Sequence, residues 1–127
     1  MLIRFETSCH NNDGDLITGI FWVTQYLYHA GQFASSQAEE DRVWEILDWY
    51  DKNLTVPTKL AKSSKKTAEK KALSWFKDSA KEHVAMMWEL TNILKRYDVP
   101  VRVLTTSSPG YVTYEDEVQI VAEPFKT

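Results

Sequence analysis

His83 is the side chain of this sequence best suited to proton transfer. Its imidazole exchanges a proton near neutral pH, as a general acid or base must, and Lys77, six residues earlier, could hold an anion. The alternative, which we favour, is that His83 packs on an apolar helical stripe with Val84 and Met87. If the protein is an enzyme, the sequence predicts a pocket between this segment and the C-terminal strands, formed by His83, Tyr111, Tyr114 and Glu115.

A run of lysines is the second chemical feature. Residues 59–81 carry eight lysines against two acidic groups, a net charge of +6, whereas residues 1–58 carry −6 and residues 82–127 carry −3. Such a block attracts an acidic protein surface or a nucleic-acid backbone, although a solvated loop has the same composition. It contains no arginine, which disfavours sequence-specific reading of bases. The predicted binding residues are Lys65, Lys66, Lys70, Lys71, Trp75 and Lys77.

No cofactor or metal motif is recognisable. The four glycines match neither a dinucleotide-binding nor a phosphate-binding loop, and the three histidines lack metal-ligand spacing. The stretch CHNNDGD fails as a calcium loop because Cys9 and Ile20 stand where acidic ligands belong. Cys9 is also the single cysteine, so an internal disulfide is excluded. We therefore predict no cofactor and no metal.

Length and composition predict one globular domain spanning residues 1–127. The chain is 43% hydrophobic and 26% charged, with sixteen aromatic residues, which argues against disorder. No apolar run approaches the roughly 18 residues of a membrane span, and the N-terminus lacks the apolar stretch of a signal peptide. We therefore expect a soluble, cytoplasmic protein that does not bind membranes.

The first half predicts one strand and two helices. Residues 2–8 alternate like a strand with one buried face, and residues 11–14 have turn composition. Asp13 or Asp15 is expected to cap a first helix that ends near Gly31. Ser36 and Glu39 form a capping box that opens a second helix through residue 50.

The second half predicts a long helix followed by strands. An apolar stripe with helical spacing runs from Ala68 to Tyr97, and we favour one continuous helix. Ser79 and Glu82 form a second capping box, which leaves a break near residues 77–78 open. Pro100 ends the helix, and residues 101–106, 111–115 and 118–123 read as a three-stranded meander with a turn at 109–110.

These elements predict a two-layer α+β domain. Short turns between strands require antiparallel pairing, and amphipathic helices need a sheet face to cover. The expected architecture is three helices packed on a mainly antiparallel sheet of about four strands, in the order β-α-α-α-β-β-β.

Two segments resemble an uncharacterised family of small bacterial proteins. They are SWFKDSAKEHV, at residues 74–84, and PGYVTYEDEVQIVAEPF, at residues 109–125. The resemblance covers part of the second half of the chain and implies a standalone bacterial domain. It implies no reaction, ligand or catalytic residue.

Because every catalytic motif sought is missing, the leading hypothesis is a non-enzymatic interaction or regulatory module. Its lysine-rich surface would bind an acidic protein or a nucleic-acid backbone, with an affinity that falls as salt rises. The alternatives are the small enzyme outlined above and a homodimer that buries surface tryptophans, which requires an exposed apolar patch on the isolated chain.

Overall fold

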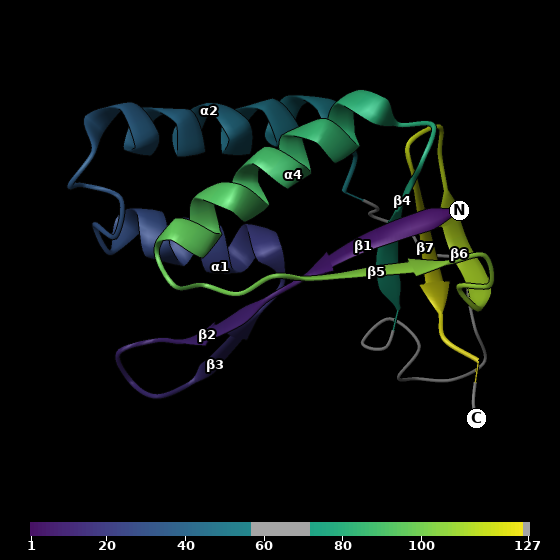
Figure 1. Cartoon of the computed structure of the whole chain (residues 1–127). Helices are drawn as coiled ribbons and strands as arrows, with labels where there is room; N and C mark the ends of the chain where they lie inside the picture. Colours follow the sequence, from purple (N-terminus) through teal and green to yellow (C-terminus); the bar gives the residue numbers. More distant parts are fainter. Residues whose placement is uncertain (57–71, 126–127) are drawn as a thin grey trace.

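A computed structural model describes residues 1–56 and 72–125 (Figure 1). Within these ranges the chain forms three helices: α1 (Ile20–His29), α2 (Gln37–Asn53) and α4 (Lys81–Arg96). The seven strands are β1 (Leu2–Glu6), β2 (Ser8–His10), β3 (Leu16–Thr18), β4 (Leu73–Lys77), β5 (Arg102–Thr106), β6 (Tyr111–Glu115) and β7 (Gln119–Glu123). The predicted α+β class with antiparallel strands is therefore confirmed.

The sheet has more strands than predicted. Five strands form one antiparallel sheet in the order β5-β1-β4-β7-β6, and β2 and β3 form a separate hairpin that projects from the body (Figure 1). The sequence analysis missed β3, because it assigned the segment after Gly14 to a helix. In the structure neither Asp13 nor Asp15 caps α1, which begins only after Gly19, a residue with φ of 96°.

The long helix expected over residues 68–97 is wrong. Residues 73–77 form β4, the chain turns at residues 78–79, and α4 begins at Lys81. Trp75 and Phe76 fit a helical stripe, but they equally fit the two faces of a strand, and a segment of five residues is too short for spacing to decide. The break near residues 77–78, left open by the sequence, is present. The part of the predicted helix before residue 72 lies outside the described residues.

The C-terminal meander is also wrong in its pairing. β6 and β7 form the expected hairpin, but β5 pairs along its whole length with β1, at the opposite edge of the sheet. The residue types of a segment predict that it forms a strand. Which strand it pairs with depends on which apolar faces can be buried together.

The short link between its two edges shows that the sheet is curled. Residues 107–110 connect β5 to β6, and the five Cα steps from Thr106 to Tyr111 reach about 17 Å at most. In a flat sheet the two edge strands would lie about 19 Å apart. Figure 1 accordingly shows β1 and β5 crossing β4, β7 and β6 at a steep angle, with the end of β5 beside β6.

The two faces of the curled sheet bury different residues. Phe5 and Phe76 face the helices and pack edge-on at 6.5 Å between ring centroids. Alternation places Leu2, Trp75 and Ala122 on the other face, where they are also buried. The main core contains Phe5, Ile20, Phe33, Val43, Ile46, Tyr50, Met87, Leu90, Ile93 and Leu94.

The start of α2 agrees with its capping box. The Ser36 hydroxyl accepts a hydrogen bond from the Glu39 amide at 3.3 Å, as predicted. The Glu39 carboxylate, however, accepts from Arg96 of α4 and so helps to join two helices. Of the helices in the described ranges, none combines the length and the apolar character that a membrane span requires.

Candidate functional site: a groove beside α1

A groove lies between α1, the C-terminal end of α2 and strands β4 and β7. It has a volume of about 410 Å³ and adjoins a smaller hollow of about 220 Å³, with which it shares Trp22 and Leu54 in its walls. Most of the wall surface is apolar, and five of the eleven lining residues are polar or charged; an apolar wall with polar groups in it is usual for a binding site. The described residues lining the larger part are Phe21, Trp22, Gln25, Leu47, Tyr50, Asp51, Leu54, Thr55, Val56, Ser74 and Gln119.

The groove exists because β1 and β4 separate. Their register contains only two pairs, Leu2 with Lys77 and Ile3 with Phe76. After these two pairs, the Arg4 guanidinium donates to the Ser74 carbonyl at 3.0 Å. This side-chain hydrogen bond satisfies a carbonyl of β4 that is not paired with the backbone of β1. Ser74 lies on the helix-facing side of β4, where its small side chain leaves space under α1.

Trp22 stands at the groove with 69% of its surface exposed. The helix that carries it, α1, has no Asp, Glu, Lys or Arg, although most surface helices carry charges on their outer face. Trp44 and Trp88 are also exposed. The described surface therefore carries three exposed tryptophans, one on each of the helices α1, α2 and α4, and dimerisation stays a prediction.

Two side chains fix the end of α2 beside the groove. His83 Nε2 lies 2.8 Å from the Asn53 carbonyl oxygen and must donate to it, and the Tyr50 hydroxyl donates to the His83 carbonyl. The imidazole also packs edge-on against Trp49 at 4.7 Å. Burial raises the pKa of Tyr50, so its hydroxyl stays protonated as a donor.

A series of hydrogen bonds between polar groups fixes the opposite rim of the groove. Gln119 Nε2 donates to the Thr55 carbonyl at 2.6 Å and to Asp116 at 3.0 Å, and the Tyr114 hydroxyl donates to the same carboxylate at 2.9 Å. Burial acts to raise the pKa of Asp116, but hydrogen bonds from the Val118 amide and from the other donors outweigh it and lower this pKa. These hydrogen bonds attach Thr55 to β7.

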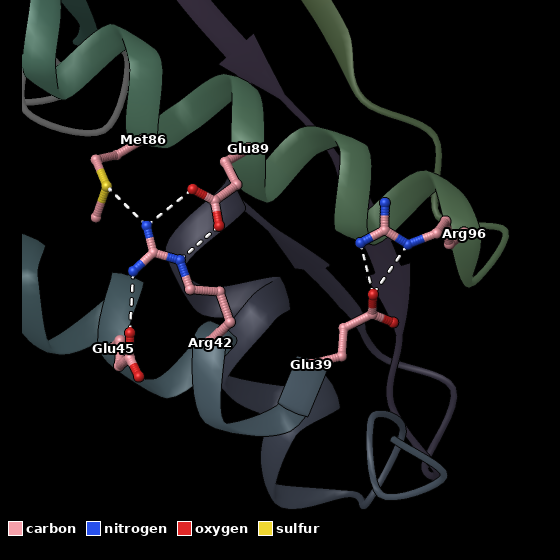
Figure 2. A network of polar contacts seen from close by, with 6 residues as sticks. All are labelled: Glu39, Arg42, Glu45, Met86, Glu89 and Arg96. Carbon is pink, nitrogen blue, oxygen red and sulfur yellow. Dashed lines mark hydrogen bonds and ion pairs between the residues drawn. The ribbon is translucent and has the colours of Figure 1, made fainter. Parts of the chain in front are cut away.

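Ion pairs hold α2 against α4 behind the groove. Figure 2 shows Arg42 of α2 donating to both Glu89 oxygens, at 2.5 and 2.8 Å, and to Glu45 at 3.0 Å. A second pair joins Glu39 to Arg96, with contacts of 2.9 and 2.5 Å. These contacts join α2 to α4, beside the core residues that the two helices share.

The residues of the predicted catalytic pocket do not meet. His83 contacts the end of α2, as described above, and Tyr111 packs edge-on against Phe125 with 4.8 Å between ring centroids. Tyr114 is bonded to Asp116, while Glu115 forms an ion pair with Lys77 at 2.6 Å. His83, Tyr114 and Glu115 therefore each make a separate polar contact within the fold.

The predicted binding residues divide into two sets. Lys65, Lys66, Lys70 and Lys71 lie outside the described residues. Trp75 is 8% exposed on the sheet face away from the helices, and its indole N–H has no partner in the described structure. Lys77 is paired with Glu115, so neither residue is freely displayed.

The sequence analysis missed the groove residues themselves. Gln119 was assigned only to a strand and Ser74 to a helix, and their shared position depends on β4 pairing with β7. Trp22 had a detectable signal, because it lies off the apolar stripe of an uncharged helix. A large aromatic residue on the outer side of a helix is a recognisable sign of a contact surface.

Comparison with known proteins gives no further guide. No family model matches the chain, and neither the curated proteins nor the solved structures contain a match. Within residues 1–56 and 72–125, no group of three or more His, Cys, Asp or Glu side chains has the geometry to hold a metal ion.

Proposed function

We propose that this chain is a non-enzymatic interaction module that binds an acidic protein partner through its lysine block. The contact residues in this proposal are Lys65, Lys66, Lys70 and Lys71. Clustered lysines speed the approach of an acidic surface and orient it, and they act as flexible point charges that adapt to many geometries.

The observation that carries the proposal is the charge of the rest of the chain. The described residues contain eight basic and seventeen acidic groups, a net charge of −9. Six of those eight basic groups form ion pairs with carboxylates within the described fold: Arg4, Arg42, Lys52, Lys77, Arg96 and Arg102. The net negative charge of the described residues therefore repels an acidic partner, while the lysine block attracts it. The partner is expected to approach with its acidic surface toward the lysine block.

The described geometry does not favour the enzyme alternative. A general base must lie within hydrogen-bond reach of the group it deprotonates, and His83 instead donates to a backbone carbonyl. We therefore propose binding rather than catalysis.

Removal of four block charges tests the proposal. Lys65, Lys66, Lys70 and Lys71 are changed together to Gln, and binding to a polyglutamate peptide is measured by fluorescence anisotropy from low to high salt. We expect about tenfold weaker binding and a shallower salt dependence, because fewer charge contacts form. The control changes Lys52, Lys95, Arg102 and Lys126, which lie outside residues 59–81, to Gln and should bind nearly as the parent does.

Two results would contradict the proposal. Equal losses in the block variant and the control would show that only net charge matters. Tighter binding to duplex DNA of matched charge than to polyglutamate would indicate a nucleic-acid partner instead.

A further inference from the structure

We propose that the groove beside α1 binds an arginine or lysine side chain presented by a partner protein segment. The groove attracts the charge opposite to that sought by the lysine block, so this inference is independent of the proposed function. It rests on three properties of the groove: its single charge, its apolar walls and the exposed ring of Trp22.

The only charged side chain among the described lining residues is Asp51. The neighbouring Asp48 is paired with Lys52 at 2.8 Å, but within the described ranges no ion pair involves Asp51. Elsewhere in that part of the chain, most basic groups have carboxylate partners, as shown above. Asp51 therefore remains as an acceptor at the edge of an apolar hollow, and a cation is the ligand group that complements it.

The apolar walls fit the carbon chain of a basic residue. Leu47, Leu54 and Phe21 line the groove beside Asp51. Arginine and lysine bury their methylene groups along apolar surface while the charged end stays at a polar site, so one side chain satisfies both parts of this groove.

Trp22 adds an aromatic face at the same place. Tryptophan attracts cations over its ring more strongly than the other aromatic side chains do, and arginine also stacks on it. The exposed indole of Trp22 is the part of the wall free to close over a bound guanidinium. A neutral side chain gains no charge attraction from Asp51 or from this ring, and an acidic one is repelled by both, so the groove selects for positive charge.

An NMR titration with two matched peptides tests the inference. The probes are the capped tripeptides Leu-Arg-Leu and Leu-citrulline-Leu, which have nearly the same shape but differ in charge. We expect the arginine peptide to shift the amide signals of Trp22, Asp51 and Gln119, and to bind about tenfold more tightly than the citrulline peptide.

Variants then assign the charge. Asp51→Asn should reduce the affinity for the arginine peptide to that of the citrulline peptide. Asp13→Asn removes the same charge from the exposed β2–β3 loop and should leave the affinity unchanged. Trp22→Ala should weaken the arginine peptide more than the citrulline peptide.

The inference is overturned by equal binding of the two peptides, by equal affinities of the Asp51→Asn variant and the parent, or by shifts confined to residues outside the groove. These results do not depend on the four block lysines, and the polyglutamate experiment does not depend on Asp51. Failure of one proposal therefore leaves the other testable.

Discussion

Gly110 shows how strictly a single residue can be determined by its surroundings. Its φ is 122°, and a Cβ atom added there would lie 2.0 Å from the Glu123 carbonyl oxygen. Residues 109–110 have the composition of a turn, and the positive φ agrees with this. The close contact with the backbone after β7 arises only from the β6–β7 pairing.

Gly110→Ala should destabilise the fold far more than Gly14→Ala does. Both glycines have positive φ, but a Cβ at Gly14 would meet no atom within 4 Å. The control therefore carries only the left-handed backbone cost of about 1–2 kcal/mol, and Gly110→Ala adds a backbone clash that should at least double it. Urea denaturation measures both, and equal losses would contradict the model of close approach.

Short sequence patterns predicted the turn at residues 109–110 and the cap of α2, but they did not predict the residues of the groove. The Ser36 cap was correct because a capping box acts within one turn of helix. Gln119 was missed because its partner Thr55 lies 64 residues away in the sequence. Neither its type nor its neighbours indicate that it joins α2 to the sheet.

At the level of elements, the contact between α2 and α4 depends on pH. The hydrogen bond from Arg42 lowers the pKa of Glu89 below its ordinary value of 4.5, and bonds from Tyr97 and then Arg96 lower that of Glu39. The stabilising contribution of such carboxylates is complete above the ordinary pKa and is lost as the pH falls through the lowered value. Arg42 and Glu89 are 38% and 42% exposed, so solvent weakens their pairing.

Glu89→Gln should therefore reduce the acid sensitivity of the fold. The free energy of unfolding of the parent should fall between pH 5 and pH 3 by more than that of the variant, because the variant has no charge at residue 89 to lose. Glu117→Gln removes an exposed carboxylate away from this contact and should retain the parental slope. If the Glu89→Gln and parental curves run parallel, the pairing of Arg42 contributes nothing to the pH dependence.

Element types were predicted better than element partners. Helices α1 and α2 and strands β1, β6 and β7 follow from periodicity and capping, which act over short distances. β4 was misassigned because Trp75 and Phe76 satisfy both helical and strand spacing. β5 was placed beside β6 because the chain connects them, whereas burial of Phe5 and Val103 on one face places it beside β1.

At the level of the whole molecule, the curled sheet buries residues on both faces. Leu2, Trp75 and Ala122 are removed from solvent on the side away from the helices. We attribute the curl to the burial of these residues. The curl brings the two edge strands close together, so that a link of four residues is long enough to join β5 to β6.

Lengthening that link should cost little. Insertion of Gly-Ser-Gly-Ser between Ser108 and Pro109 doubles the link from four to eight residues, which should cost only about 0.6 kcal/mol of closure entropy. Thermal denaturation measures the change, and the circular dichroism spectrum should be retained. A loss of several kcal/mol would mean that the short link, rather than burial, imposes the curl.

The narrow junction between β1 and β4 also determines how the molecule responds to force. A pull applied between the two ends of the chain passes from β1 through β4 to β7, and the first of these junctions has two register pairs against four in the second. Under tension the β1–β5 pair should therefore peel away as a unit at low force, with the Arg4 contact to Ser74 among the first to rupture. The domain should therefore separate first between β1 and β4, while β4, β7 and β6 stay paired.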